Sequence, residues 1–292
     1  MDARMQPTDE ELQALVPGPG SVTWGRAADA RILIAAGYAL VLQVAHPIVG
    51  IGVAEHSDFR RDPWKRLLRT LDFTSTLIFS EPPVAAAVAR DLRLEHTRIK
   101  GTMPDGSRYH ALEPGAFAWV WASLYDATVT AHRHFGDPLS QQEERQLWDE
   151  WRRLGRLLGV RERDLPATLD GYYDYFDAIV SDVLEDNESV RDVLASLAEP
   201  ACPRRLQAIE PAWRIGRMPG SHALRLATVG LLPIVLRERL ALRWTLAQDL
   251  ELRALGAASR ATTKVMPRQL RVFGPSYLRW RQSRAGAQRA AA

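Results

Sequence analysis

The sequence predicts an all-α fold that forms a single globular domain. Apolar residues recur at helical spacing along the whole chain of 292 residues, and no alternating run of β-branched residues is long enough for a sheet. Proline, glycine and capping residues divide this pattern into helices of ordinary length. Because 46% of the residues are hydrophobic, the chain can bury a large core.

Residues 1–21 form an N-terminal segment that precedes the domain. Thr8 and the acidic residues after it predict a short helix, which ends at Pro17. The segment is polar and lacks the basic start and apolar run of a secretory signal, so we do not expect export. The domain itself is expected to cover residues 22–281.

A buried helix is predicted from about Asp29 to Ala45. The stretch from Ile32 to Ala54 is almost uncharged and long enough to cross a bilayer, but a proline follows His46 in its middle. We therefore expect the helix to end near Ala45 in a turn. Association with a membrane surface stays open, whereas a spanning helix is not expected.

Two helices with clear start signals follow. Asp62 provides the cap of the first, which begins with a proline and covers about 63–79. The second begins after Ser80, carries His96 and is expected to end at Gly101, because glycine commonly terminates helices.

The remaining chain continues the helical pattern after one interruption. The connection over 102–115 is rich in turn residues and is the most favourable place for a small hairpin. The last third is punctuated by prolines and returns to basic amphipathic helices, and the arginine- and alanine-rich tail over 282–292 is expected to fray. Before it, glycine and proline separate four helices, at about 116–135, 139–158, 166–184 and 188–199.

The composition excludes several partners and sites. The 38 basic and 35 acidic residues are interleaved and give a net charge of +3, without the basic stripe that nucleic-acid binding requires. The one cysteine, Cys202, excludes an intramolecular disulfide and a cysteine zinc cluster. It fits a reducing compartment, so we expect a cytoplasmic protein.

The most informative motif lies in the helix that carries His96. Arg93, His96 and Lys100 fall at i, i+3 and i+7 on one predicted face, beside an apolar stripe. A buried histidine bonded to a backbone carbonyl, on a helix with a solvated edge, is the simpler interpretation. An imidazole that binds a haem iron, with a cation on either side for the two propionates, accounts for all three residues. His96 is thus the candidate metal ligand, and Arg93 and Lys100 are candidate cofactor-binding residues.

The preceding helix presents a second cationic face. Arg66, Arg69, Thr70 and Phe73 lie at i, i+3, i+4 and i+7. A solvated face is the alternative, yet the same helix carries aromatic and aliphatic residues that require burial. Buried arginines need anionic or acceptor partners, which the propionates of a cofactor would supply.

Two histidines upstream could face the other side of a cofactor. One is His46, and the other is His56, which lies in the segment Glu55-His56-Ser57-Asp58. A histidine that follows a buried helix is more often a hydrogen-bonded core residue. His56 is therefore the better candidate for such a role, and His46 the weaker one.

Other classes of site do not fit the sequence. It contains no His-Glu-x-x-His zinc motif, no Glu-x-x-His pairs of a di-iron bundle, no glycine-rich phosphate loop and no nucleophile elbow. Asp170, Asp174 and Asp177 fall at helical spacing, as in a carboxylate metal site. Tyrosines and a phenylalanine are interleaved with them, so an amphipathic helix is favoured.

Four motifs in the first half of the chain resemble those of one known family. The motifs are Ala45-His-Pro47, Ser57-Asp-Phe59, Arg66-x-x-Arg69-Thr70 and Arg93-x-x-His96-x-x-x-Lys100. They are similar to motifs of the bacterial rubber oxygenases (latex-clearing proteins) and the fungal MpaB-type oxygenases. The resemblance covers about 22–135 well, and the rest of the chain only through its helical character and length.

Members of that family are all-α, hold haem b and cleave carbon–carbon double bonds of polyisoprenoid or prenyl chains with dioxygen. The resemblance thus implies a haem b-dependent oxygenase that acts on a hydrophobic, unsaturated small molecule. It assigns the iron to His96, and the distal side of the pocket to Arg66 and Thr70. A non-catalytic haem carrier or gas sensor, and a helical lipid-binding protein without cofactor, remain the alternatives.

The sequence departs from the family's pattern at two positions. The rubber-cleaving members carry a lysine directly before the threonine, whereas this chain has Arg69, whose guanidinium cannot ligate iron. Arg69 is therefore expected to bind the cofactor only through its charge. Those members also place a glutamate near the iron as a base, and Glu55 is the nearest candidate here, although at a different spacing. The chain is shorter than the secreted rubber enzymes, which makes a polymer outside the cell a poor expected substrate.

Overall fold

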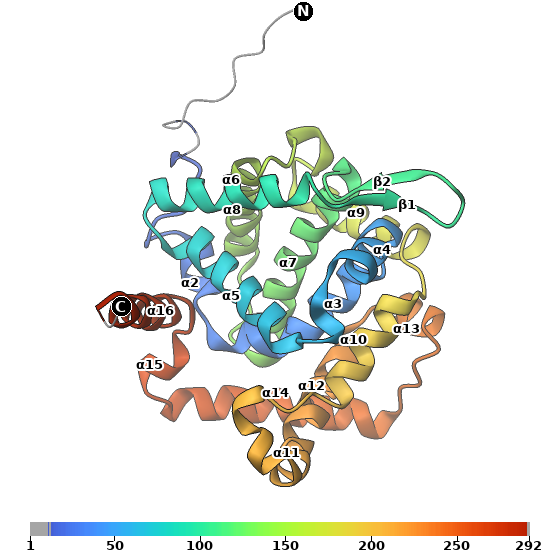
Figure 1. The fold of residues 1–292 in the computed structure, drawn as a ribbon, viewed down its shortest axis with the longest axis vertical. Helices are drawn as coiled ribbons and strands as arrows, with labels where there is room; N and C mark the ends of the chain where they lie inside the picture. The colour runs from blue at the N-terminus through green and yellow to red at the C-terminus, as the bar shows by residue number, and fades with distance from the viewer. Residues whose placement is uncertain (1–10, 12, 291–292) are drawn as a thin grey trace, which may run out of the picture.

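The helix α7 (Pro114–Phe135) runs through the middle of the computed structural model and carries much of its core (Figure 1). Its side chains of Trp119 and Tyr125 are completely buried. The structure describes residue 11 and residues 13–290. Within them the chain forms one all-α domain with a small two-stranded sheet, so the predicted fold class is confirmed. The helix start predicted at Thr8 lies outside the described residues.

The chain reaches the core through four short elements. They are α2 (Val22–Ala27), the 3-10 helix η1 (Ala30–Ala35), α3 (Ala36–Val44) and α4 (Pro47–His56). η1 and α3 pack against α7 and together form the buried helix predicted over 29–45. The predicted turn after Ala45 is confirmed, because α3 ends at Val44 and the chain turns at Ala45 and His46 before α4 starts at Pro47. Proline is well suited to the first helical position, where its missing N–H costs no hydrogen bond.

No single helix in the described part of the chain is long and apolar enough to cross a membrane. One pair of helices is long and apolar enough only when its two members are taken together. The pair is Ala30–Val44 with Pro47–His56, and it is bent by 102°.

The helices α5 (Pro63–Phe79) and α6 (Pro82–His96) pack side by side. The carboxylate of Asp62 accepts a hydrogen bond from the backbone N–H of Lys65, the third residue of α5, which confirms the predicted cap. The predicted end of the second helix at Gly101 is wrong, because α6 already ends at His96.

The chain leaves α6 to form the hairpin that the sequence predicted. β1 (Lys100–Thr102) pairs antiparallel with β2 (Arg108–His110), and Gly101 lies opposite Tyr109. Gly106 occupies the turn with a φ of +86°, in the left-handed region that glycine favours. Pairing with β2 satisfies the backbone groups that follow α6, so the strand replaces the last helical turn that local sequence suggested.

Three further helices lie at the positions predicted for them: α8 (Gln141–Leu158), α9 (Leu169–Asp182) and α10 (Glu188–Ala198). Ser140 and Glu143 form a capping box at the start of α8, and Gly159 ends that helix with a φ of +89°. α8 and α9 pack Trp148 and Tyr172 against each other and against Tyr125 of α7.

The last third of the chain forms one more 3-10 helix and six α-helices. They are η4 (Arg204–Ile209), α11 (Glu210–Gly216), α12 (Met218–Leu231), α13 (Ile234–Arg239), α14 (Leu246–Val265), α15 (Arg268–Arg271) and α16 (Gly274–Ala290). α12 packs on α3 and α10, whereas α16 packs on α5. There Tyr277 and Arg281 donate to the carboxylate of Asp72 at 2.5 and 2.7 Å. The tail predicted to fray from residue 282 is helical as far as Ala290, in keeping with the helix propensity of alanine and arginine.

Candidate functional site

His96, the last residue of α6, has the hydrogen-bond pattern of a metal-binding imidazole. Its Nδ1 lies 2.8 Å from the carbonyl oxygen of Leu92, one turn earlier. A carbonyl can only accept, so Nδ1 carries the proton and Nε2 keeps its lone pair. Within residues 11 and 13–290, Nε2 has no hydrogen-bond partner. Histidines that ligate metals are usually held in this way, with the other ring nitrogen donating to a carbonyl or carboxylate.

The surroundings of His96 favour the neutral ring. The imidazole is half-buried and meets Phe117 edge-on, with ring centroids 5.9 Å apart and an interplanar angle of 74°. Burial lowers the pKa of His96, the Leu92 carbonyl and Glu95 oppose this shift, and the positive charge of Arg66 reinforces it. The net shift is downward, so the ring is neutral near pH 7, as a ligand must be.

Arg66, on α5, is a cation without a carboxylate partner in the described part of the chain. Its Nη1 donates to the hydroxyl of Ser57 at 2.6 Å. Surrounding protein desolvates the guanidinium and lowers its pKa, and the charge of Arg69 lowers it further. The side chain is nevertheless accessible to solvent. A desolvated yet accessible cation of this kind can bind an anionic group.

Arg69 and Thr70 lie beside Arg66 on the same helix. Arg69 donates to Glu95 of α6 at 3.0 Å, and both of these side chains are more than half exposed, at 63% and 60%. The hydroxyl of Thr70 donates to the carbonyl oxygen of Arg66 at 3.2 Å, which leaves its lone pairs free to accept. The Arg69–Glu95 pair joins α5 to the residue before His96, so the two predicted motifs meet in the structure.

Glu55 and His56, at the end of α4, form a cluster with the hairpin. The hydroxyl of Tyr109 donates to Oε2 of Glu55, and Nε2 of His56 lies 3.8 Å from the same oxygen. Ser57, the next residue, is the acceptor for Arg66. Within the described residues, no hydrogen bond or ion pair joins Glu55 or His56 to His96, and the bond between Ser57 and Arg66 connects this cluster to α5.

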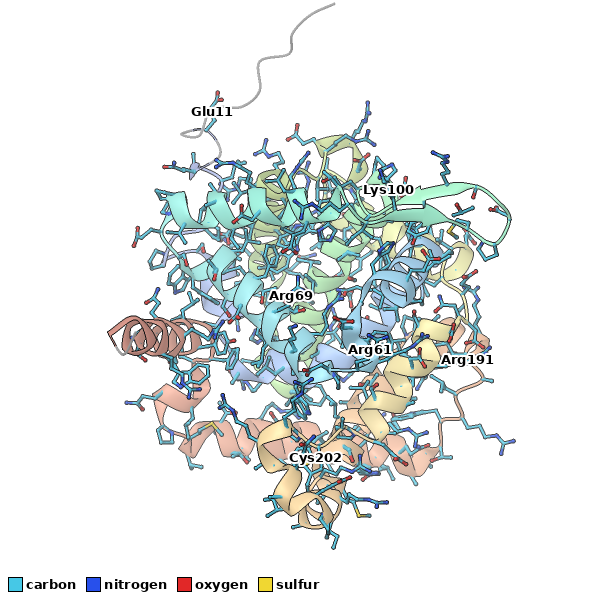
Figure 2. All side chains as sticks on the ribbon, in the orientation of Figure 1. Glu11, Arg61, Arg69, Lys100, Arg191 and Cys202 are labelled. Atoms are coloured by element: carbon cyan, nitrogen blue, oxygen red, sulfur yellow. The ribbon has the colours of Figure 1, made fainter. Side chains whose placement is uncertain are left out.

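Lys100 does not lie on the helical face of His96 that the sequence predicted, whereas Arg93 lies three residues before His96 on the same helix. Because α6 ends at His96, Lys100 lies in β1, and the predicted i+7 position on the helix is wrong. Figure 2 shows Lys100 at the start of the hairpin and Arg69 on α5. The guanidinium of Arg93 lies against Gly159 at the end of α8.

His46, the weaker candidate, is buried at the start of α4. Its Nδ1 has no hydrogen-bond partner among the described residues, and its exposed fraction is 7%. Burial lowers its pKa, and the charge of Glu113 acts in the opposite direction. His46 is therefore a core histidine in its neutral form.

Two aromatic residues of the site were not singled out from the sequence. Phe117 and Tyr109 contact His96 and Glu55 only because α7 and the hairpin fold back onto the ends of α6 and α4. In the sequence they are indistinguishable from core aromatic residues. Asp170, Asp174 and Asp177 lie on the exposed side of α9, whose opposite side buries Tyr172 and Phe176.

The described residues contain no group of three or more histidine, cysteine, aspartate or glutamate side chains that could hold a metal ion. A metal at His96 would thus take one protein ligand and its other donors from a cofactor. Haem b would meet this requirement, because it would bring its own nitrogen donors and leave one position for His96. The residues present therefore fit a haem-bound iron better than an ion held by protein alone.

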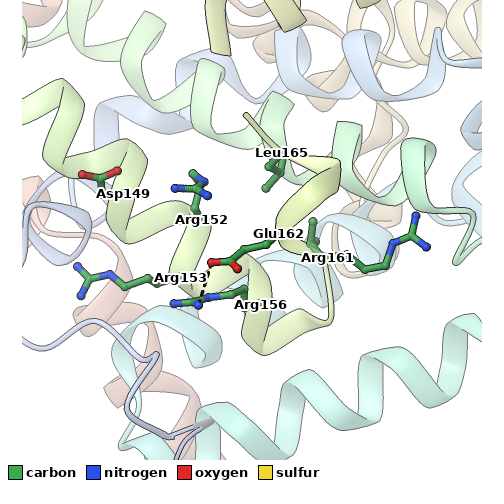
Figure 3. Close-up of a pocket in the computed structure, with 8 residues that line it drawn as sticks. Asp149, Arg152, Arg153, Arg156, Arg161, Glu162 and Leu165 are labelled. Atoms are coloured by element: carbon green, nitrogen blue, oxygen red, sulfur yellow. Dashed lines mark hydrogen bonds and ion pairs between the residues drawn. The ribbon is translucent and has the colours of Figure 1, made fainter. Parts of the chain in front are cut away.

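A separate hollow of about 360 Å³ lies between α8 and the 3-10 helix η3 (Glu162–Asp164) (Figure 3). Arg152, Arg153 and Arg156 line it, and Arg156 pairs with Glu162 at 3.1 Å. It shares no residue with the group around His96 and is open to solvent. Arginines at the end of a helix also stabilise the helix dipole, which is a sufficient reason for their presence.

Comparison with known proteins bears on the residues gathered around His96. The sequence matches the family described as "ER-bound oxygenase mpaB/B'/Rubber oxygenase, catalytic domain" over residues 24–261, which include every candidate site residue. It is similar to "Uncharacterized protein Mb2261" of Mycobacterium bovis and "Uncharacterized protein Rv2237" of Mycobacterium tuberculosis. Each is 24% identical over 239 residues, which cover 80% of this chain and 89% of the relative. No solved structure matches the chain.

Proposed function

The chain belongs to the mpaB/rubber oxygenase family, and we propose that it is a haem b-dependent oxygenase that acts with dioxygen on a hydrophobic small molecule. The observation that carries the haem assignment is the state of His96. Its ring is neutral, its Nδ1 proton is bound by Leu92, and its Nε2 has no partner within the described residues. Nitrogens of a fully buried structural histidine ordinarily have hydrogen-bond partners, whereas Nε2 of His96 is available to a ligand.

In this proposal His96 holds the iron through Nε2. Bound haem b would supply an iron centre able to activate dioxygen. Arg66 and Arg69 provide positive charge for anionic groups, and the lowered pKa of Arg66 reflects a desolvated guanidinium that gains from a nearby negative charge. The contact of Arg93 with Gly159 favours a structural role for that residue over the propionate binding expected from the sequence, and Lys100 lies in the hairpin rather than on α6.

The family's pattern assigns Arg66 and Thr70 to the side of the pocket where dioxygen and substrate meet. Ser57 holds the guanidinium of Arg66, which leaves its other N–H groups free to donate. Thr70 can accept a hydrogen bond there, because its own proton is bound by the Arg66 carbonyl. Glu55 is the proposed base, with His56 beside it, and the hydrogen bond from Tyr109 fixes the orientation of its carboxylate.

The haem assignment is tested with His96→Ala and a matched control, His222→Ala. His222 is an exposed histidine on α12 that pairs with Glu251, far along the chain from α6. Protein expressed with added iron should contain about one b-type haem per chain, and His96→Ala should lose it while His222→Ala keeps it. Full haem content and an unchanged ferrous carbon monoxide spectrum in His96→Ala would show that another residue binds the iron.

The same preparations separate the oxygenase from its alternatives. A helical lipid-binding protein would show no Soret band, whereas a haem carrier or gas sensor would show one without turnover. An oxygenase should consume dioxygen and convert an unsaturated prenyl chain when reduced. Membership in an oxygenase family favours turnover.

A further inference from the structure

The near balance of charge in the whole chain conceals a strongly basic C-terminal part. Residues 200–292 contain 17 of the 38 basic side chains but only 4 of the 35 acidic ones, a net charge of +13. The preceding 199 residues carry the compensating −10. The basic segment forms η4 and α11 to α16, which gather along one side of the molecule, drawn in orange and red in Figure 1.

The solvent-facing side of α14 is mainly apolar, which is the reverse of an ordinary surface helix. Leu246, Leu250 and Val265 are 76%, 58% and 83% exposed, whereas Leu252 on the opposite side is buried. Exposed residues at intervals of three and four extend this side along the helix: Leu246, Leu250, Ala254, Ala257, Ala261 and Val265. Single exposed leucines are common, but a continuous apolar stripe along 20 residues marks an interaction surface.

The neighbouring helices α12 and α11 carry further exposed apolar side chains. Nε2 of His222 on α12 lies 2.6 Å from Oε1 of Glu251, which joins α12 to the edge of the stripe on α14. Met218 lies one turn before His222 and is 63% exposed, and Ile215 of α11 is 73% exposed. We call the exposed side of Ile215, Met218, Leu246, Leu250 and Val265 the apolar face.

The charged side chains around the apolar face that have no ion-pair partner are basic. The two acidic residues of α14 both have partners, since Asp249 pairs with Arg253 at 2.9 Å and Glu251 with His222. Arg243 and Lys264, near the two ends of α14, are exposed and form no ion pair within the described residues. The apolar face is thus flanked by cations that are free to meet negative charge from outside.

We propose that the apolar face docks on the surface of an anionic lipid membrane, with α14 lying along it. Apolar side chains that insert at the level of the headgroups, combined with basic side chains that meet anionic lipids, are the two signals that hold a protein on such a surface. Nucleic acid would leave the apolar side chains without a partner. A second copy would bring an equally basic face into contact with the first, and the like charges would repel.

Vesicle co-sedimentation of the full chain tests the proposal. Wild-type protein should bind vesicles that contain phosphatidylglycerol and bind pure phosphatidylcholine vesicles weakly. Arg243→Gln and Lys264→Gln should each weaken binding to the anionic vesicles about fivefold. Leu246→Ser with Leu250→Ser should weaken it by about tenfold or more.

The matched control changes exposed apolar residues outside the basic segment. Val84 and Leu94 of α6 are 50% and 56% exposed, so Val84→Ser with Leu94→Ser removes comparable surface and should leave vesicle binding unchanged. All replaced side chains are exposed, and circular dichroism would show that the helices persist. Haem content should be the same in every variant, so failure here leaves the proposed function untouched.

Three outcomes would overturn the proposal. The first is wild-type binding by the Leu246/Leu250 variant, and the second is equal binding to neutral and anionic vesicles. The third is a dimer in solution that the same variant dissociates, together with no vesicle binding, which would assign the apolar face to a second copy of the chain.

Discussion

The guanidinium of Arg93 lies directly against the backbone of Gly159, so that a Cβ atom built on Gly159 would be 1.3 Å from Nη1 of Arg93. Gly159 ends α8 in the left-handed conformation, where the last carbonyl groups of that helix lack intrahelical partners. A cation at this position is favoured by the helix dipole. The contact therefore gives Arg93 a structural role that competes with the propionate binding expected from the sequence.

Replacing Arg93 by alanine separates these two roles. Loss of a cation at a helix C-terminus should lower the free energy of unfolding by about 0.3–1 kcal/mol. The rate at which haem transfers to an apo acceptor should stay at the wild-type value. Lys100→Ala, at an exposed position in β1, is the control and should change neither quantity. Faster haem loss in both variants would restore the sequence prediction.

Gly101 allows the hairpin to approach Glu55. A Cβ atom on Gly101 would come within 2.6 Å of the ring of Tyr109 and 2.7 Å of Oε2 of Glu55. Gly101→Ala should therefore push these groups apart and cost about 1–3 kcal/mol of stability, measured by urea unfolding.

Gly52 provides the control for this substitution. It lies in α4 near the same tyrosine ring, but its Cβ would meet the ring at 3.7 Å, an ordinary contact. Gly52→Ala should be neutral or stabilising, because alanine favours a helix by up to about 1 kcal/mol over glycine. Equal effects of the two substitutions would show that the hairpin does not rest on Glu55.

Buried histidines should make the fold sensitive to acid below about pH 6.5. Burial lowers the pKa of His132, although the carbonyl of Arg26 and the charge of Asp29 oppose this shift. The folded state then binds a proton less readily than the unfolded state. The contribution of His132 to stability is complete above its pKa in the unfolded state. It declines as the pH falls from there toward its pKa in the folded state.

The pH dependence of urea unfolding measures this effect. Wild-type protein should lose stability as the pH falls from 7 to 5, the range in which histidine titrates. His132→Gln removes one titrating group and should reduce the slope, even if the variant is less stable throughout. A slope equal to that of the wild type would mean that other groups control the response.

Local sequence patterns predict contacts that form within one helical turn. Asp62 and its following proline define the start of α5 through bonds within one helical turn, and that prediction is confirmed. The end of α6 depends instead on strand pairing between Lys100 and His110, which the helical pattern of α6 does not predict. The partner of Arg93 lies in another helix, at Gly159, so no spacing within α6 could reveal it.

In the candidate site, too, local bonds could be predicted from the sequence and long-range contacts could not. The bond from His96 to the carbonyl of Leu92 spans four residues, and a histidine in the last turn of a helix could have indicated it. The bond from Arg66 to Ser57 joins two motifs that the sequence had already singled out. The contact with Phe117 requires the start of α7 to lie beside the end of α6, which composition and periodicity do not specify.

Thr70 offers a test of the distal pocket that does not depend on turnover alone. Thr70→Ala should leave haem content intact, because the residue is not proposed to hold the cofactor. Loss of one hydrogen bond of about 1 kcal/mol should lower oxygen-dependent conversion of a prenyl chain about fivefold and shift the stretching frequency of ferrous-bound carbon monoxide. Thr74→Ala is the matched control, since its hydroxyl bonds to the carbonyl of Thr70 at 2.9 Å on the same helix. If Thr70→Ala and Thr74→Ala give the same carbon monoxide spectrum and the same rate of conversion, Thr70 has no specific role in the pocket. A general weakening of α5 would then explain the results for both variants.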